Sequence, residues 1–316
     1  MKMMKVLVFS KDRAMQVQAT LQSFLAHCAD TENIRINVLY TCSNEQHSRQ
    51  YLQLAQEWQS HPQVRFIEQN RFRRDVFNIL NPYSSTSFQN SIYAFLAHVH
   101  PRIVRVCRCL VSPPRTPSLI MFLVDDAIFT HEFRLSEIIE CLAMRRDALG
   151  FSLRLGENTT YSYMSDREQQ LPVFEPVDSN VQKYMWTKAD QDFGYPLEVS
   201  SSIYRLVDVI PILLEIKFDN PNLLEGGMNK RRNRFASTRP FLLCYNRSVA
   251  FCNPVNLVQT VSLQNRAGTK RHYSPTELAN LFDAGNRINF EAYHHTTPVS
   301  CHQEMELVFK KRDNTS

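Results

Sequence analysis

Strand-like and helix-like segments alternate through the first part of the chain, and this alternation limits the folds available to it. Short apolar runs predict strands, and apolar residues at helical spacing predict helices. The predicted strands cover residues 6–9, 34–40, 64–67 and 119–124, and the predicted helices cover 12–27, 46–58 and 85–98. Alternation of this kind favours a mostly parallel sheet with helices on both faces, so we expect an α/β fold.

The second half of the sequence is less regular. Residues 99–118 are rich in arginine and proline and predict a loop, whereas residues 132–149 predict a helix. Residues 151–174 show little periodicity, which favours loops and short strands, and 205–216 predict a short helix around a proline. Ser274 begins a capping box with proline at the first helical position, and Gly285 suits the end of that helix.

Composition excludes several classes of protein. Of the 316 residues 43% are hydrophobic, but no apolar stretch approaches the length of about 20 residues that a membrane helix needs. The amino terminus lacks the features of a secretory signal, so we expect a cytoplasmic protein. The 8 cysteines follow neither a disulfide framework nor the usual spacing of a zinc site.

Two carboxylates occupy an unusual place in this pattern. Asp125 and Asp126 directly follow the apolar run 121–124 and precede a second apolar triplet. Open α/β sheets present their ligands at the carboxyl ends of strands. Adjacent anions repel each other, so we expect a cation or several hydrogen-bond donors to face them. The alternative is a surface turn in which both acids are solvated.

A second polar group ends the first predicted strand. Ser10, Lys11, Asp12 and Arg13 follow the apolar residues 6–9 directly. Ser10 or Asp12 can cap the next helix, whose amino terminus favours anions, and the two basic side chains add positive charge there. On a parallel sheet this segment and the acidic pair share one edge. Alone, the segment also fits a capped helix with two solvated basic residues.

These two motifs resemble those of nucleotide-sugar glycosyltransferases of the GT-A fold. The matching stretches are VLVFSKDR at residues 6–13 and MFLVDDAIF at residues 121–129. In that family the end of the first strand holds the nucleotide, often through an arginine that corresponds to Arg13. The second motif, called DxD, holds a divalent metal that bridges the diphosphate of the sugar donor. The pattern here is Val-Asp-Asp instead.

The resemblance implies an architecture and a division of roles. It implies one GT-A-like (Rossmann-like) domain over residues 1–316, with a nucleotide-sugar-binding half at 1–130 and an acceptor-binding half with a helical C-terminal region at 131–316. Asp126 would bind the metal, and Asp125 the ribose or sugar of the donor. The expected ligands are a nucleotide-sugar donor, a glycan or other hydroxyl acceptor, and Mn²⁺ or Mg²⁺.

Metal and phosphate chemistry agree with this assignment. A departing diphosphate must be neutralised, and a cation held by carboxylates does so as a Lewis acid. Lys11, Arg13 and Arg74 can add positive charge, although Arg74 also fits a solvated basic loop. His302 resembles the late histidine that completes the metal shell in some GT-A enzymes, and imidazole suits Mn²⁺. His294 and His295 compete with it for that role.

Acceptor and catalytic residues are expected in the second half. Glu225 stands before two glycines, so a ligand can approach it closely, and it is the candidate general base if the reaction inverts the sugar. The alternative is a glutamate that ends a helix before a glycine cap. Tyr195, Glu198 and Ser201 combine a ring, a carboxylate and a hydroxyl, which suits sugar recognition. A loop packed on the core explains them equally.

Other functions use parts of the same pattern. A phosphoryl receiver places its acidic pair after the first strand, and a nucleotidyltransferase needs a glycine-rich loop; with 7 glycines in all, this chain has no such loop. A non-catalytic nucleic-acid-binding protein can use the basic clusters at 102–115 and 230–234. The net charge is only +5, and no recognised nucleic-acid-binding motif accompanies those clusters, so we expect no nucleic acid as a partner and no membrane span.

Overall fold

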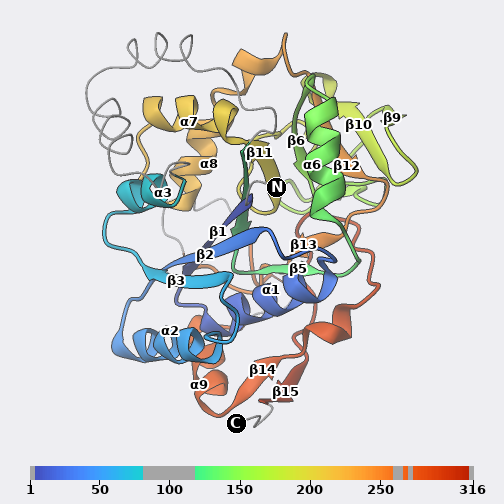
Figure 1. Ribbon diagram of the computed structural model, residues 1–316. Helices are drawn as coiled ribbons and strands as arrows, with labels where there is room; N and C mark the ends of the chain where they lie inside the picture. The colour runs from blue at the N-terminus through green and yellow to red at the C-terminus, as the bar shows by residue number, and fades with distance from the viewer. Residues whose placement is uncertain (1–3, 81–117, 259–265, 270–272, 313–316) are drawn as a thin grey trace.

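A nine-stranded sheet forms the centre of the computed structural model, which describes residues 4–80, 118–258, 266–269 and 273–312 (Figure 1). From one edge to the other its strands are β3 (Val64–Glu68), β2 (Ile34–Thr41), β1 (Met4–Lys11), β4 (Leu119–Val124), β11 (Ser202–Arg205), β6 (Ala148–Ser152), β12 (Phe241–Tyr245), β10 (Val181–Met185) and β9 (Phe174–Pro176). The first four are parallel to one another, as are β6 and β12, whereas β11, β9 and β10 pair antiparallel with their neighbours. The predicted α/β class is confirmed, and strands from both halves of the chain share the sheet.

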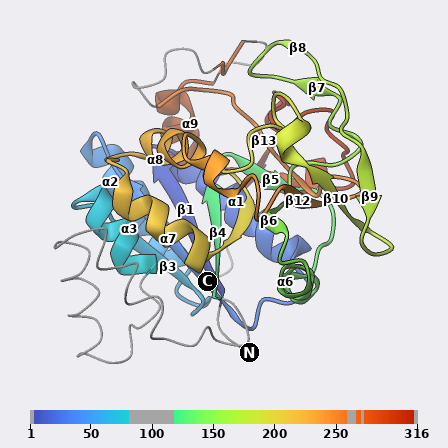
Figure 2. The same ribbon diagram turned by 90° about the horizontal axis from the view of Figure 1, so that it is seen from above.

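Helices cover both faces of this sheet. They are α1 (Ala14–His27), α2 (Glu45–Glu57), α3 (Phe72–Leu80), α6 (Leu135–Met144), α7 (Leu206–Glu215), α8 (Pro221–Asn229) and α9 (Pro275–Asp283). One core lies between the sheet and helices α1, α2, α6 and α9, and a second lies between the sheet and α3, α7 and α8. Figure 2 shows β1 and β4 between α1 and α7. Because both faces are covered, alternate residues of β1 and β4 enter opposite cores, which explains their continuous apolar sequence.

Shorter elements complete the fold. Three two-stranded ribbons pair β5 (Ala127–Phe129) with β13 (Ala250–Cys252), β14 (Asn286–Ile288) with β15 (Phe309–Lys311), and β7 (Tyr161–Ser162) with β8 (Arg167–Glu168). Short 3-10 helices cover Trp186–Lys188, Arg232–Phe235 and Phe290–Tyr293. Within the described ranges no helix is long and apolar enough to cross a membrane.

The elements that bracket the site agree with the sequence expectation. The strands predicted at 6–9, 34–40, 64–67 and 119–124 and the first two helices are all present. The capping box at Ser274 is confirmed, and Gly285, which follows the C-cap residue of α9, has a φ of +77°. The helix predicted over 85–98 and most of the loop predicted over 99–118 lie outside the described residues.

One alternative and one expectation about local structure were wrong. The segment around Arg74, for which a solvated basic loop was the alternative, forms α3, and Asp75 Oδ2 accepts from the backbone N–H groups of Asn70 and Arg71 just before it. The helix predicted over 132–149 ends at Met144, and residues from Ala148 form β6. Pairing of β6 with β11 and β12 overrides the helical pattern there, because the strand is buried on both sides.

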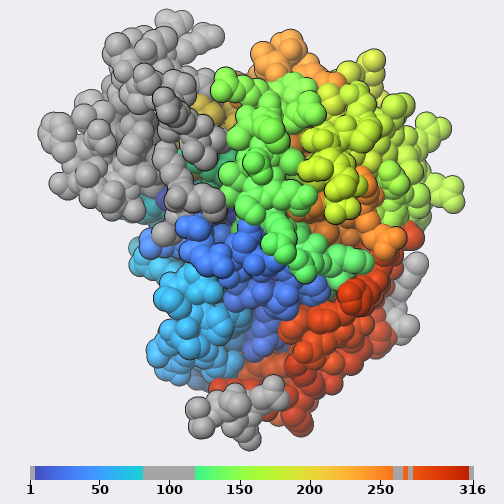
Figure 3. Space-filling model, turned by 45° about the vertical axis from the view of Figure 1, so that its right-hand side comes forward, coloured from blue at the N-terminus to red at the C-terminus, as the bar shows by residue number. Residues whose placement is uncertain are grey.

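The C-terminal segment packs against the first helices of the chain. Figure 3 shows the C-terminal residues alongside the N-terminal residues on the surface. Gln50 of α2 donates to the carbonyl of Ala279 and to Asp283 of α9. Arg287, just beyond, forms an ion pair with Glu57 at the end of α2. Helix α9 and the strand after it are therefore anchored to the side of the sheet that carries α1 and α2.

Candidate functional site

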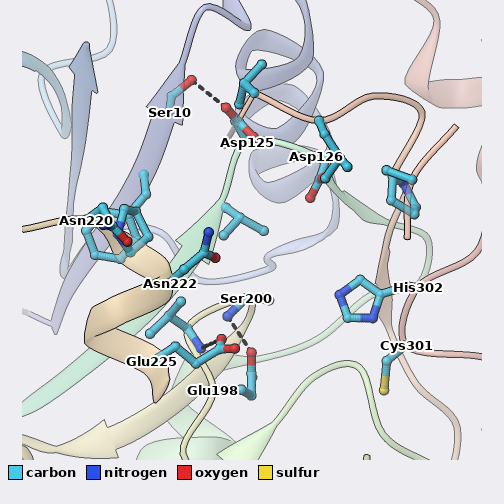
Figure 4. A pocket seen from close by; sticks show the side chains of 18 of the residues that line it. Ser10, Asp125, Asp126, Glu198, Ser200, Asn220, Asn222, Glu225, Cys301 and His302 are labelled. Atoms are coloured by element: carbon cyan, nitrogen blue, oxygen red, sulfur yellow. Dashed lines mark hydrogen bonds between the residues drawn. The ribbon is translucent and has the colours of Figure 1, made fainter. Parts of the chain in front are cut away.

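A cavity of about 930 Å³ opens at the carboxyl ends of β1, β2 and β4. The chain passes from β1 to β2 and β3 on one side and later returns to β4 on the other side of β1, so β1 and β4 flank a topological switch point. Residues from β6, from α8 and from the segment 191–202 form further walls. Figure 4 shows Asp125 and Asp126 on one side of this cavity and Glu198 and Glu225 on the opposite side.

Asp125 is held by a dense set of donors. Its Oδ1 accepts from Arg13 Nη1 at 2.9 Å, and its Oδ2 accepts from Ser10 Oγ at 2.9 Å and from the backbone N–H of Lys11 at 3.2 Å. Thr20 Oγ1 donates to the backbone carbonyl of the same residue. The Asp125 side chain is only 5% exposed. Because Asp125 is buried, the acidic pair is not a solvated turn. The ion pair and the hydrogen bonds stabilise this buried carboxylate.

Arg13 connects three segments of the chain at this edge. Besides Asp125, its guanidinium contacts Asp126 Oδ2 at 3.4 Å and donates to the side-chain and backbone oxygens of Asn256. Asn256 follows β13, so the segment after that strand is fixed to β1 and β4. The Arg13 side chain is buried and committed to protein acceptors. It lines the cavity and organises this edge through those contacts.

Asp126 is the less engaged member of the pair. Its side chain is 14% exposed and lines the cavity, with the longer contact to Arg13 and a hydrogen bond from the Cys252 thiol. Burial raises the pKa of Asp126 to about 6, with repulsion from Asp125 in the same direction and attraction by Arg13 opposed to it. A further cation close to Asp126 would favour the charged form of this carboxylate and so lower its pKa.

The expected capping of α1 by Ser10 or Asp12 was wrong. Arg13 occupies the cap position without a side-chain hydrogen bond to the helix. Ser10 points to Asp125 instead, and Asp12 Oδ1 accepts from the backbone N–H of Ser43 after β2. Asp12 has a φ of +54°, a conformation that aspartate adopts more readily than most residues. The β1–α1 turn is thus built to aim Ser10 and Arg13 at β4.

Glu225 lies on the opposite wall of the cavity. It projects from the middle of α8, which begins after the cap residue Asn220, and the two glycines that follow it lie inside the helix and form no cap. A Cβ on Gly227 would lie 2.9 Å from the terminal Cδ1 of Ile216, so a larger residue there would have to displace that side chain. Oε2 of Glu225 accepts from the backbone N–H of Val199 at 2.9 Å, and the Tyr195 hydroxyl also donates to this carboxylate.

The environment of Glu225 shifts its titration to neutral pH. Burial, with added repulsion from Glu198, raises the pKa of Glu225 to about 7. The hydrogen bonds from Val199 and Tyr195 oppose this shift, because they favour the charged form. A carboxylate with this pKa can both accept and release a proton near neutrality, as acid–base catalysis requires.

Replacing the Glu225 carboxyl group by an amide should change how the free energy of unfolding depends on pH. Glu225→Gln is expected to gain stability relative to wild type, by ~2 kcal/mol, as the pH rises from 5 to 8. The folded protein keeps the Glu225 proton up to about pH 7, whereas the unfolded chain releases it near 4.5, so ionisation disfavours folding increasingly through that window. Chemical denaturation of both proteins at the two pH values measures this difference. An unchanged difference would contradict the shifted pKa.

Glu198 and His302 meet at a buried arginine that follows β6. Arg154 Nη2 donates to Glu198 Oε2 at 2.9 Å, and its Nη1 lies 3.1 Å from Nε2 of His302. Because a guanidinium can only donate, Nε2 of His302 accepts and its proton lies on Nδ1. Burial and then the charge of Arg154 hold the pKa of His302 well below its usual value. In this arrangement neither ring nitrogen offers a free lone pair.

Several predicted residues lie away from the cavity. Arg74 is exposed on α3, and Ser201 is fully buried, whereas its neighbours Ser200 and Ser202 line the cavity. His294 and His295 contact His27 and His131 instead. The basic cluster at 102–115 lies outside the described residues. In the cluster at 230–234, Arg231 and Arg234 form ion pairs with Glu215.

Sequence reasoning missed three residues that contribute to the site. Arg154 and Asn256 lie far along the chain from their partners and stand in no motif, so no local signal marks them. Tyr51 reaches the site from the middle of α2, where its helical spacing indicates only a core residue. Each makes its contribution through contacts that depend on the tertiary fold.

The residues around Asp126 form an incomplete shell for a metal ion. No group of three or more histidine, cysteine, aspartate or glutamate side chains within the described part of the chain is arranged to hold one. A divalent cation bound through one or two carboxylates usually completes its shell with water and substrate phosphates. The donor set at Asp126 therefore fits a cation that arrives with a diphosphate, and not one held by protein alone.

Comparison with known proteins gives one curated relative. No family model matches the chain. It is 24% identical over 315 residues to a bifunctional glycosyltransferase, pgtA, of Dictyostelium discoideum; the match covers 92% of this chain and 36% of that protein. The chain thus spans about a third of its relative's length.

Solved structures show a more distant likeness. S. aureus TarS, residues 1–349, has a TM-score of 0.43 at 12% identity, with 80% of this chain and 60% of that chain covered. The Pyrobaculum calidifontis mannosyltransferase PcManGT, in complex with GDP-Man and Mn²⁺, has a TM-score of 0.33 at 6% identity, covering 71% and 51%. The chain is thus similar in sequence to a bifunctional glycosyltransferase, and its sheet, flanked by helices, has the α/β architecture that its sequence predicts.

Proposed function

We propose that this protein transfers a sugar from a nucleotide-diphosphate-sugar donor to a hydroxyl group of a glycan or other acceptor. The observation that carries the proposal is the single cavity that unites the Asp125–Asp126 edge with Glu225. One wall offers carboxylates and basic groups suited to a diphosphate and its cation. The facing wall offers a carboxylate whose pKa suits proton transfer. Similarity to a glycosyltransferase supports the same assignment.

The donor end of the cavity is formed by the edge of β1, β2 and β4. Asp126 would hold Mn²⁺ or Mg²⁺ together with the donor phosphates, and the bound cation would supply Lewis-acid stabilisation of the departing diphosphate. Lys11 lines the cavity beside this edge and adds positive charge. Ser10, Arg13 and Asp125 shape the edge through their mutual contacts. His302 can join the cation only if Arg154 turns away from Nε2.

The acceptor end contains the proposed general base. Glu225 would take the proton from the acceptor hydroxyl as its oxygen bonds to the anomeric carbon. The bond between that carbon and the phosphate oxygen breaks, and the nucleoside diphosphate leaves with the electron pair. Attack from the face opposite the leaving group inverts the anomeric carbon. Tyr195 orients Glu225 through its hydroxyl, and Glu198 fixes Arg154 nearby.

Binding of nucleotide and metal is expected to be cooperative. Because Asp126 supplies too few ligands alone, Mn²⁺ should bind weakly without nucleotide and tightly with it, and by linkage Mn²⁺ should strengthen nucleotide binding equally. Thermal unfolding with UDP, GDP or ADP, each with and without Mn²⁺, measures this effect. A rise in melting temperature of several degrees for one nucleotide with Mn²⁺ is expected. No response to any pair would contradict the proposal.

Released nucleoside diphosphate identifies the donor. Incubation with UDP-, GDP- and ADP-sugars, with and without simple glycoside acceptors, should release the nucleoside diphosphate of one donor. The alternatives of a nucleic-acid-binding protein and a nucleotidyltransferase are not favoured by the glycosyltransferase relative. A nucleic-acid-binding protein would instead show affinity that falls steeply with salt.

A further inference from the structure

Tyr51 reaches the donor edge of the cavity from the helix behind it. Its side chain is fully buried, and its ring stacks on Tyr40 of β2, with centroids 4.4 Å apart. Its hydroxyl contacts Ser10 Oγ and accepts from the backbone N–H of Arg13 at 3.2 Å. Tyr51 thus lies within hydrogen-bonding distance of two residues of the β1–α1 turn, without lining the cavity itself.

The direction of each hydrogen bond in this group is fixed. The Ser10 hydroxyl donates its only hydrogen to Asp125 Oδ2, so its oxygen must accept the hydrogen bond from the Tyr51 hydroxyl. Tyr51 then uses its own proton on Ser10 and accepts from Arg13 N–H. The guanidinium of the same arginine returns to Asp125 Oδ1, which closes a ring of donors and acceptors. We call this ring of Arg13, Tyr51, Ser10 and Asp125 the hydroxyl relay.

We infer that Tyr51 is a positioning residue of the donor site, an inference that rests on the proposed function. Through Ser10 it holds the Asp125 carboxylate against Arg13, so that the guanidinium remains committed to Asp125. Asp126 keeps only the longer of the two Arg13 contacts, at 3.4 Å, beside the hydrogen bond from Cys252, and it faces the cavity where a cation–diphosphate pair would bind. The relay therefore assigns different tasks to the two acids: Asp125 organises the edge, and Asp126 faces the ligand.

Removal of the Tyr51 hydroxyl should disturb this division. In Tyr51→Phe the buried N–H of Arg13 loses its acceptor and Ser10 loses its donor, and a buried polar group without a partner is costly. Asp125 is then held less firmly, and Arg13 is free to turn toward Asp126. The cation and the guanidinium then compete for one carboxylate.

The experiment compares Tyr51→Phe with Tyr40→Phe. Both remove one hydroxyl from a stacked, buried ring, but only the Tyr51 hydroxyl belongs to the relay. Calorimetry with UDP and with GDP, each with and without Mn²⁺, measures nucleotide affinity, and Mn²⁺ paramagnetic resonance measures bound metal directly. We expect the gain in affinity from Mn²⁺ to fall about 10-fold in Tyr51→Phe. Metal-free nucleotide binding, and both affinities of Tyr40→Phe, should equal those of wild type.

A double-mutant cycle tests the relay itself. Ser10→Ala breaks the adjacent link and also serves if Tyr51→Phe does not fold; within one relay, the double variant should lose little more than either single variant. Additive losses, equal losses in Tyr51→Phe and Tyr40→Phe, or an unaltered Tyr51→Phe would overturn this inference alone. Wild-type protein that binds none of UDP, GDP and ADP with Mn²⁺ would overturn the proposed function, and this inference with it.

Discussion

Glu225→Gln is expected to lower kcat by ~10²–10⁴-fold, with a smaller effect on KM. Glutamine keeps the size of the side chain and can still accept from Val199, but it cannot take a proton from the acceptor hydroxyl. The loss therefore falls on the chemical step. Initial rates of nucleoside diphosphate release at saturating donor and acceptor measure it. Asp219→Asn, a change of an exposed carboxyl that lines the same cavity, is the matched control and should leave kcat unchanged.

The pH profile gives a second measure of the same role. Because burial raises the pKa of Glu225 to about 7, kcat should rise as the pH increases through 7 and the carboxylate forms. Tyr195→Phe removes a hydrogen bond that favours the charged form, so the rise should move to higher pH. Wild-type activity in Glu225→Gln, or an unmoved profile in Tyr195→Phe, would contradict the assignment of Glu225 as the base.

The sequence predicts the donor edge well because that edge follows from local patterns. Continuous apolar runs mark strands covered on both faces, and the polar residues that end them must lie at one edge of a parallel sheet. Ser10, Arg13, Asp125 and Asp126 are therefore brought together as expected. Their individual tasks do not follow from such patterns. Arg13 was expected at the nucleotide, and that role stays a prediction; its guanidinium donates to Asp125, Asp126 and Asn256, contacts that no local pattern indicates.

The facing wall is less predictable because its partners are distant in sequence. The position of Glu225 opposite Asp126 depends on how α8 packs after α7, and Arg154 meets Glu198 only through the order of the sheet strands. A shift of one position also decides which side chains face the cavity. Ser200 and Ser202 line it and Ser201 does not, which an irregular sequence gives no means to predict.

Asp126→Asn is expected to abolish the gain in nucleotide affinity from Mn²⁺ and to lower kcat at least ~10²-fold. Asparagine keeps one carbonyl oxygen but loses the negative charge that attracts a divalent cation. Nucleotide binding without metal should remain, because the change leaves Ser10, Lys11 and Asp125 in place. Calorimetry of UDP and GDP with and without Mn²⁺, and rates of diphosphate release, measure the two effects.

Asp126→Asn and Asp125→Asn should differ in their effect on the melting temperature. At neutral pH Asp126→Asn is expected to unfold at no lower temperature than wild type, because burial and repulsion from Asp125 disfavour the charged form of Asp126. Asp125→Asn should melt lower, since it removes the partner of a buried arginine and leaves that charge poorly compensated. Calorimetric melting of both variants checks this contrast.

Retention of the Mn²⁺ effect in Asp126→Asn would exclude Asp126 as the metal ligand. Neither acid of the pair would then bind the cation, because Asp125 is already occupied by the hydroxyl relay.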